Sequence, residues 1–339
     1  MGAFYWLSLI QIPTIFIALF RYLSKFRNKG RVFRIIHAAV RLLSIITLIF
    51  SLLEISFNAF FINSDSFGFT LSSKIWLQRY WKPINEQGYR DNEISTDTAK
   101  AKIVVLGDSV AAGHGIKNIK NRMAAYLASE VGPDLTVNTI AKCGWDTPDQ
   151  VAALKTRSDT PAFVFLVHYI NDVDYLGRKY HVERAAYPDV PSIPFISLLV
   201  NNTLIFNSLF WNIYKGANSE LGEQYWEYLL EIYRSDNMLI EHVENIESIR
   251  EYLSQYSTGF HVILVPDLAG LAASRSLMTR LAEFLDIAEI GYTDITDSIS
   301  QIPEKKLVVS RMDAHPSILV HKIIGNAMAE HINDLDNGK

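Results

Sequence analysis

The chain contains very little cysteine, because Cys143 is the only one among its 339 residues. A single cysteine excludes a disulfide framework within the chain and a cysteine-rich metal site. The sequence also contains no internal repeat and no low-complexity tract. Its length suits one large domain with attachments, or two small domains.

Acidic residues are scarce near the N-terminus. Residues 1–62 contain seven of the 32 basic residues but only one of the 36 acidic residues, Glu54. Residues 63–339 therefore hold 25 basic and 35 acidic residues, a formal charge of −10. This balance argues against a nucleic-acid partner.

Charge is almost absent from two long runs. Residues 3–20 (AFYWLSLIQIPTIFIALF) have no charge, and residues 42–61 (LLSIITLIFSLLEISFNAFF) have only Glu54. Both runs approach the length of a membrane-spanning helix. The basic stretch between them, RYLSKFRNKGRVFR, predicts a cytoplasmic loop. We therefore expect residues 1–62 to form two transmembrane helices in the inner membrane, with the remaining chain on the extracytoplasmic side.

Two other interpretations of the apolar runs stay open. They could be a pair of buried core helices. The first run could instead be a cleaved signal peptide, although it lacks a charged n-region and a small-residue cleavage site. The role of Glu54 cannot be read from the sequence.

The rest of the chain predicts an α/β fold. Residues 63–100 look like a membrane-proximal linker of low regularity, and residues 101–339 like one domain. Apolar strand patterns at 103–106, 136–140, 163–167 and 261–265 alternate with helical patterns, which indicates a mostly parallel sheet covered by helices on both faces. A mostly helical insertion, about residues 173–256, could shape a substrate groove.

A candidate nucleophile follows the first predicted strand, in IVVLGDSVAAGHG (residues 103–115). Ser109 lies just past the carboxyl end of a strand, where open α/β sheets bind ligands. A serine needs a base and usually a group that orients the base. Asp313 and His315, two residues apart, can project to the same side of an extended segment. Alternatively, this Asp-Ala-His-Pro stretch is only a helix N-terminus.

Two further strand ends offer hydrogen-bond donors for an oxyanion. Gly144 could present its backbone N–H, and Asn171 could present its side-chain amide. Asp108 is expected to be a structural hydrogen-bonding residue. His114 could approach the site, but a solvated loop histidine is the simpler interpretation.

Taken together, these four motifs resemble the block order of the SGNH/GDSL hydrolases over roughly residues 101–332. The resemblance implies a flavodoxin-like three-layer α/β/α sandwich. It implies Ser109 as nucleophile, His315 as base and Asp313 as its orienting acid. It also implies an oxyanion hole from the backbone N–H groups of Ser109 and Gly144 and the side chain of Asn171. The family acts on esters, thioesters and acylated sugars without a metal, and no cofactor is expected.

The sequence departs from the family pattern at two places. Tyr169 occupies a position that is usually glycine, which could narrow the pocket beside Asn171. Asp313 precedes His315 by two residues instead of three, a form similar to SGNH proteins of bacterial exopolysaccharide and envelope acylation, including alginate O-acetylation proteins.

The predicted function is a membrane-anchored serine esterase or O-acyltransferase acting on acyl, in particular acetyl, esters of envelope glycans or lipids. A transferase could receive its acyl groups from a multispanning membrane partner. The alternative is a non-catalytic glycan-binding or assembly protein with the same fold.

Overall fold

The structure is a computed structural model that describes residues 3–26, 30–93, 101–157, 159–184, 193–217, 220–336 and 338. It divides into two compact units. The first comprises Met1–Asn63, Gly68–Trp76 and Pro188–Ala217, and the second comprises Ser64–Phe67, Leu77–Tyr187 and Asn218–Lys339.

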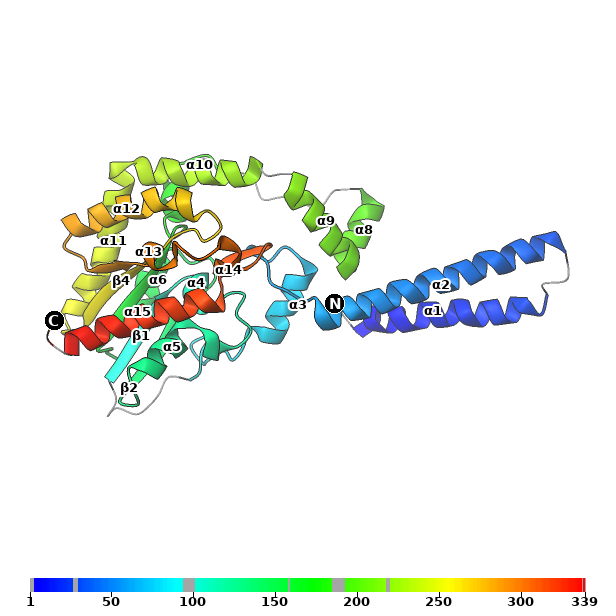
Figure 1. Cartoon of the computed structure of the whole chain (residues 1–339), viewed down its shortest axis with the longest axis horizontal. Coiled ribbons are helices and arrows are strands. Elements are labelled where there is room, and N and C mark those ends of the chain that lie inside the picture. The colour runs from blue at the N-terminus through cyan, green and yellow to red at the C-terminus, as the bar shows by residue number, and fades with distance from the viewer. Residues whose placement is uncertain are drawn as a thin grey trace. The chain divides into compact units, whose positions relative to one another are not determined.

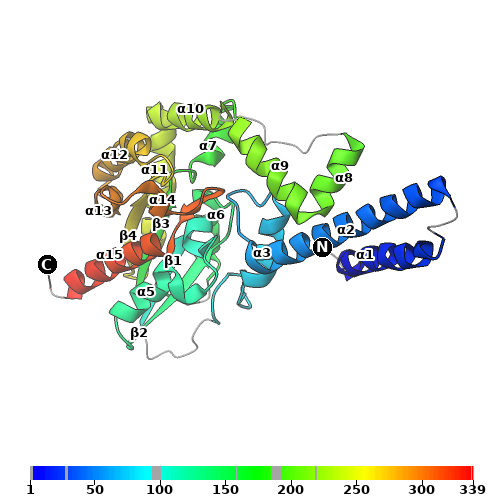
Figure 2. The ribbon, with the colours of Figure 1, turned by 45° about the vertical axis from the view of Figure 1, so that its right-hand side comes forward.

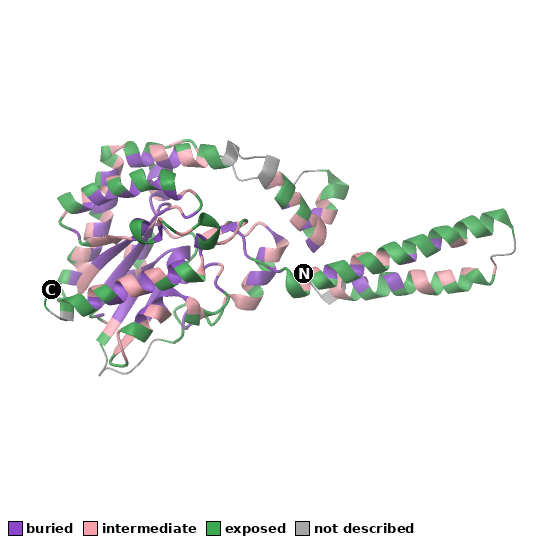
Figure 3. Ribbon diagram, in the orientation of Figure 1, coloured by how far each residue is buried: buried purple, intermediate pink, exposed green. Residues whose placement is uncertain are grey.

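The first unit is helical. Helices α1 (Ala3–Ser24) and α2 (Arg31–Phe60) lie side by side (Figure 1). Both are long and apolar enough to cross a membrane, with mean hydropathies of 1.5 and 2.1, and most of their residues are exposed (Figure 3). The helices continue into the basic stretch that the sequence predicted as a loop, so only a short connection separates them. Helices α8 (Pro194–Asn202) and α9 (Leu204–Ala217) complete this unit with the first part of α3 (Leu71–Tyr80).

The second unit is built on a parallel sheet, as the sequence predicted. Its strands are β1 (Ala101–Gly107), β2 (Leu135–Ala141), β3 (Phe163–Tyr169), β4 (Gly259–Val265) and β5 (Tyr292–Asp294). They pair in the order β2-β1-β3-β4-β5, all parallel. This is the strand order of the flavodoxin-like doubly wound fold.

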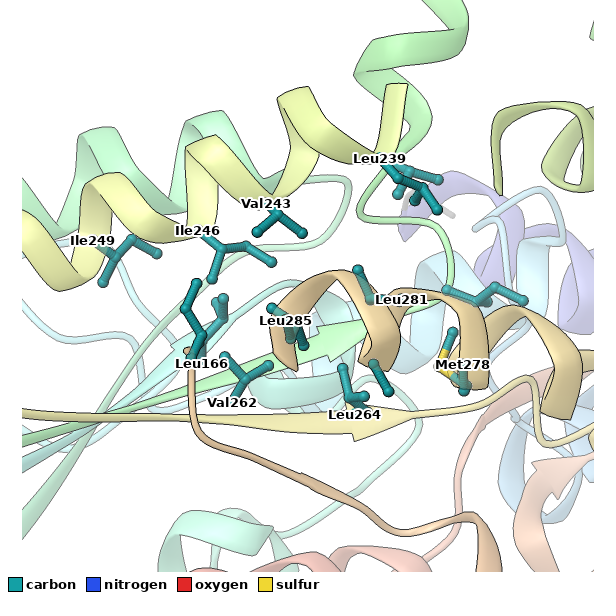
Figure 4. Close-up of a cluster of buried hydrophobic side chains, with 14 of the residues drawn as sticks. Leu166, Leu239, Val243, Ile246, Ile249, Val262, Leu264, Met278, Leu281 and Leu285 are labelled. Atoms are coloured by element: carbon teal, nitrogen blue, oxygen red, sulfur yellow. The ribbon is translucent and has the colours of Figure 1, made fainter. Parts of the chain in front are cut away.

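Helices cover both faces of the sheet because alternate strand residues point to opposite sides. Val104 and Leu106 join one apolar cluster with α6 (Thr147–Lys155), α11 (Asp236–Ser254) and α12 (Leu271–Ile287), part of which Figure 4 shows. Ile103 and Val105 join the other cluster, with α5 (Met123–Glu130) and α15 (Ile318–Asp336). The result is the three-layer sandwich that the resemblance implied.

The remaining elements are short, apart from α10. They are α4 (Ser109–Ala112), a 3-10 turn (Ile119–Asn121), α7 (Asp174–Lys179), α10 (Glu220–Arg234), α13 (Thr296–Ile299), α14 (Glu304–Leu307), β6 (Val308–Ser310) and β7 (Asp313–Pro316).

The segment expected as an insertion, residues 173–256, has two structural roles. Its last helix, α11, lies in the β3–β4 connection and packs on the sheet, because parallel neighbours need a crossover. Its middle part, α8 and α9, belongs to the first unit.

Residues 63–93, the described part of the segment expected as a linker, have more order than the sequence indicated, whereas residues 94–100 lie outside the described residues. The buried Arg90 guanidinium donates hydrogen bonds to the carbonyls of Gly113 (2.6 Å) and Ile116 (2.5 Å). Asp91 pairs with the buried Arg122 at 2.9 Å. Backbone carbonyls as partners leave no pattern in the sequence, which is why this stretch looked irregular.

Candidate active site

Ser109 lies where the sequence placed it, immediately after β1 and at the first residue of α4. The Asp108 carboxylate caps this short helix by accepting a hydrogen bond from the Val110 N–H at 2.7 Å. Burial raises the pKa of Asp108, against the opposing effect of the Val110 N–H. The cap fixes the backbone at Ser109, whose side chain lies in a largely buried position, 7% exposed.

The structure brings Ser109, His315 and Asp313 together in one chain of hydrogen bonds. His315 Nε2 lies 2.8 Å from Ser109 Oγ, and His315 Nδ1 lies 2.6 Å from Asp313 Oδ1. An ionised carboxylate can only accept, so Nδ1 is the donor and Nε2 keeps a lone pair toward the serine. Ser109 Oγ is also 3.1 Å from Asp108 Oδ2. The single hydroxyl proton can serve one acceptor at a time, and His315 is the nearer one.

Asp313 is held in its ionised form. It is completely buried, and burial by itself would raise its pKa. The hydrogen bond and charge of His315, with smaller contributions from His114 and from the Ser64 hydroxyl, outweigh burial and lower the pKa to about 2. Asp313 is therefore a carboxylate at neutral pH, and it can stabilise the positive charge that His315 gains when it takes the proton of Ser109.

The sequence missed the place of His114. It is buried, 5% exposed, and its ring packs against that of His315 with centroids 4.4 Å apart. Nε2 is 2.9 Å from the carbonyl of Asp65, and Nδ1 is 3.7 Å from Cys143 Sγ. Burial, followed by the charge of His315, lowers the pKa of His114 to about 4. At pH 7 it is therefore a neutral ring that supports the base without adding charge.

The glycine beside His114 is the signal that could have located it. Gly115 has φ +82°, and a Cβ there would lie 2.9 Å from Asp313 Oδ2 and 2.5 Å from a methyl of Val309. A side chain at this position would therefore collide with the acid of the cluster. The glycines of the Gly-His-Gly stretch mark close packing, which turns His114 inward.

Gly144 and Asn171 follow the strands that flank β1. Gly107, the last residue of β1, is in register with Ala141 of β2 and with Val167 of β3. Gly144 and Asn171 come three and four residues later, so both lie beyond the same edge of the sheet as Ser109. Gly144 has φ +77°, which only glycine adopts readily. Within the described residues, the buried Oδ1 of Asn171 has no hydrogen-bond partner.

The neighbours of Asn171 fix its turn. Asp172 is completely buried and accepts hydrogen bonds from the Tyr169 N–H (3.1 Å) and from Gln150 Nε2 (3.2 Å). The Tyr169 side chain, at the family's glycine position, hydrogen-bonds Asp267. The tyrosine is thus anchored, and the backbone turn at Asn171 is held through the carboxylate of Asp172.

Three side chains of the site are of types that can bind a metal ion. His114, Asp313 and His315 each offer an atom within 4.8 Å of the others. The hydrogen bonds described above already engage Asp313 Oδ1 and Nδ1 of His315 with each other, and Nε2 of His114 with Asp65. The three possible metal ligands are therefore the base proposed for Ser109, the acid that orients this base, and the histidine ring packed against it.

Comparison with known proteins gives structural neighbours only. No family model and no curated protein matches the chain. A lipase from a goat rumen metagenome is 12% identical, with a TM-score of 0.44 over 68% of this chain and 97% of its own. A member of the lipolytic G-D-S-L family from Veillonella parvula is 13% identical, with a TM-score of 0.37 over 68% and 97%.

A carbohydrate acetylesterase family member from Sinorhizobium meliloti is 12% identical, with a TM-score of 0.38 over 68% and 97% of the two chains. The neighbours are GDSL-type hydrolases, as the resemblance in the sequence predicted.

Proposed function

We propose that the chain is a serine-dependent ester hydrolase or O-acyltransferase with Ser109 as its nucleophile. The observation that carries the proposal is the hydrogen-bond chain from Ser109 Oγ through His315 to Asp313, with distances of 2.8 and 2.6 Å. A serine hydroxyl becomes a competent nucleophile when a base in hydrogen-bond reach accepts its proton, and the base works best when a carboxylate fixes its tautomer.

The first step forms an acyl-enzyme. Ser109 Oγ attacks the carbonyl carbon of the ester while its proton moves to His315 Nε2. The carbonyl oxygen becomes an oxyanion, for which the N–H groups of Ser109 and Gly144 and the amide of Asn171 are the proposed donors. When the tetrahedral intermediate collapses, the bond to the alcohol breaks, and the alcohol leaves with the proton from His315.

The second step removes the acyl group. A hydroxyl compound takes the place of the first alcohol, gives its proton to His315 and attacks the acyl carbon. The bond between the acyl carbon and Ser109 Oγ then breaks, and Oγ takes the proton back from His315. Water as this acceptor gives an esterase, and a sugar hydroxyl gives an O-acyltransferase. We assign the substrate to acyl esters of envelope glycans or lipids, supported by the two candidate membrane spans and by the Asp-x-His spacing.

The direct test is turnover of p-nitrophenyl acetate by the detergent-solubilised full chain. Ser109→Ala should lower turnover to background, since loss of such a nucleophile typically costs roughly 10⁶. Ser276→Ala, an exposed serine on α12, is the matched control and should keep full activity. A fluorophosphonate probe should label the wild type and the Ser276→Ala variant, but not Ser109→Ala.

Acceptor sugars divide the two enzyme classes. If an added oligosaccharide speeds the release of p-nitrophenol and becomes acylated, the chain is a transferase. If the rate of release is the same with and without the oligosaccharide, the chain is an esterase. Well-folded wild type that neither turns over substrate nor reacts with the probe would contradict the nucleophile assignment and favour a binding protein.

The membrane arrangement has its own test. With α1 and α2 as spans and the basic stretch in the cytoplasm, reporter domains fused after Phe61 should be active only outside the cytoplasm. Fusions active only inside would overturn the anchoring while leaving the chemistry of Ser109 intact.

A further inference from the structure

The middle of the chain contains a third stretch without charge. Residues 193–214 (IPFISLLVNNTLIFNSLFWNIY) include no Asp, Glu, Lys or Arg. They form α8 and most of α9, which lie next to each other in the first unit (Figure 2). Within residues 173–256, this apolar stretch therefore coincides with the part that belongs to the first unit and not to the α/β unit.

The apolar side chains of this stretch are largely exposed. The exposed fractions are 56% for Ile193, 69% for Phe195, 60% for Leu198, 53% for Leu209 and 62% for Ile213. Single exposed apolar residues are common in soluble proteins, but large contiguous sets mark an interaction surface. No described residue therefore fully covers these five apolar side chains.

Two side chains with hydrogen-bonding groups on these helices, Asn207 and Trp211, are buried in the protein. Asn207 is 3% exposed, donates to the Val200 carbonyl (2.9 Å) and accepts from the Leu71 N–H (2.9 Å). Trp211, 6% exposed, stacks on Phe69 with ring centroids 5.5 Å apart. The exposed amides of Asn201, Asn202 and Asn212 donate to residues four positions earlier on their own helices, which lowers the cost of placing them in hydrocarbon.

Glu54 of α2 joins this pair of helices to the candidate span. It is completely buried, and its carboxylate accepts hydrogen bonds from the first two N–H groups of α9, those of Leu204 (3.0 Å) and Ile205 (2.8 Å), and from the Tyr5 hydroxyl. Helix N-termini attract anions because their first N–H groups lack partners. An acid inside an apolar run is costly unless it is paired in this way.

The position of Glu54 sets the depth of α9. Six residues separate Glu54 from the end of α2 at Phe60, which is about 9 Å along a helix axis. If the apolar run 42–61 crosses the bilayer, the start of α9 lies about 9 Å inside its outer edge. With 9 and 14 residues, α8 and α9 are about 14 and 21 Å long, too short to span a hydrocarbon core of about 30 Å.

We propose that α8 and α9 form a helical hairpin that inserts into the outer leaflet of the bilayer beside α2 without crossing it. The partner is the lipid hydrocarbon itself, which covers the exposed side chains of Ile193, Phe195, Leu198, Leu209 and Ile213. The inference rests on the membrane anchoring proposed above and adds a second, non-spanning attachment from the middle of the chain.

The test measures lipid contact residue by residue in the full chain. Cys143 is replaced by serine, and single cysteines are introduced as Leu198→Cys and Leu209→Cys for a small fluorescent label. The reference positions are Ile49→Cys, exposed on α2, and Ile287→Cys, 79% exposed at the end of α12. Each protein is reconstituted into phosphatidylcholine vesicles with or without nitroxide on the acyl chains, and elution as a single gel-filtration peak in detergent checks its fold.

Nitroxide lipids should quench the labels at residues 198 and 209 as strongly as the label at residue 49, and leave the label at residue 287 bright. Quenching at residue 49 together with bright, iodide-accessible labels at residues 198 and 209 would overturn the hairpin but not the anchor. Loss of quenching at residue 49 as well would remove the anchoring and, with it, this inference.

Discussion

Oδ2 of Asp313 accepts a hydrogen bond from the hydroxyl of Ser64, a residue 249 positions earlier in the chain. Two more hydrogen bonds join the same segment to β7 and to the residue before it. The Ser66 N–H donates to the Met312 carbonyl (3.0 Å), and Ser66 Oγ accepts from the Ala314 N–H (2.8 Å). The segment that follows α2 within four residues therefore holds the acid of the proposed triad.

Ser64→Ala removes this support and should lower turnover by roughly 10- to 100-fold, because a hydrogen bond to a charged group contributes about 1.5–3 kcal/mol. The hydroxyl also helps to keep the pKa of Asp313 low, so the acid limb of the pH–rate profile should move to higher pH. Ser129→Ala, an exposed serine on α5, is the control. A lower melting temperature with an unmoved acid limb would mean that Ser64 has only a structural role.

Asp313 should also contribute a pH-dependent part of the stability. Its pKa in the folded chain is about 2, below the usual value of about 3.9. A depressed acid pKa stabilises the folded state above the unfolded pKa, and this contribution is lost as pH falls through the folded pKa. The stabilisation, about 2 kcal/mol, should therefore disappear between about pH 4 and pH 2.

Denaturant unfolding of the wild type and Asp313→Asn at stepped pH measures this contribution. The stability difference between the two proteins should shrink as pH falls through that window, whereas Asp297→Asn, whose side chain is 87% exposed, should show no such trend. Taking the difference removes the parallel effect of the buried His168 and His321, whose lowered pKa values destabilise both proteins in acid. A constant difference would contradict a lowered pKa at Asp313.

The sequence was informative where a residue type and its strand position carry the signal. Short continuous apolar runs predicted the strands, and the residues after three strand ends predicted where Ser109, Gly144 and Asn171 lie. Asp313 and His315 were found because residues two apart in an extended segment project to the same side. These features depend on local chemistry that a single sequence displays.

The residues that the sequence missed are defined by distant partners. His114 is placed by Asp65, Cys143 and His315, and none of these contacts has a local pattern. Glu54 stayed unexplained because two of its three partners are backbone N–H groups, those of Leu204 and Ile205, about 150 residues away. Backbone donors and acceptors are the same for every residue type, so their use cannot be read from side-chain identity.

The ion pair of Asp91 and Arg122 predicts a large stability effect. Both residues are buried, and Asp91 also accepts a hydrogen bond from the Thr139 N–H at 2.6 Å. Asp91→Ala leaves a buried guanidinium without its counter-charge, which should cost about 3–5 kcal/mol. Asp236→Ala breaks a surface pair with Arg280 and should cost at most about 1 kcal/mol.

Unfolding free energies of the two variants in the same detergent make the comparison. Equal losses would show that residues 77–93 are dispensable to the α/β unit, in line with the linker that the sequence suggested.

Gly115 and Gly132 form a matched pair for testing how tightly the site is packed. Their φ angles are +82° and +85°, so alanine strains the backbone equally at both positions, by about 1–2 kcal/mol. A Cβ at Gly132 meets nothing within 4 Å, whereas one at Gly115 collides with Val309 and approaches Asp313 Oδ2 to 2.9 Å. Gly115→Ala should therefore lose a further 1–3 kcal/mol or so of stability from overpacking.

Turnover separates the two variants more sharply than stability does. Displacing Asp313 by even a fraction of an ångström misaligns His315, and misplacement of about 1 Å in such a site can cost roughly 10² in rate. Gly132→Ala should retain wild-type turnover on p-nitrophenyl acetate because the added Cβ meets nothing within 4 Å. If Gly115→Ala were as active as Gly132→Ala, the Gly-His-Gly turn would not control the position of the acid, and the support attributed to His114 and Gly115 would have to be abandoned.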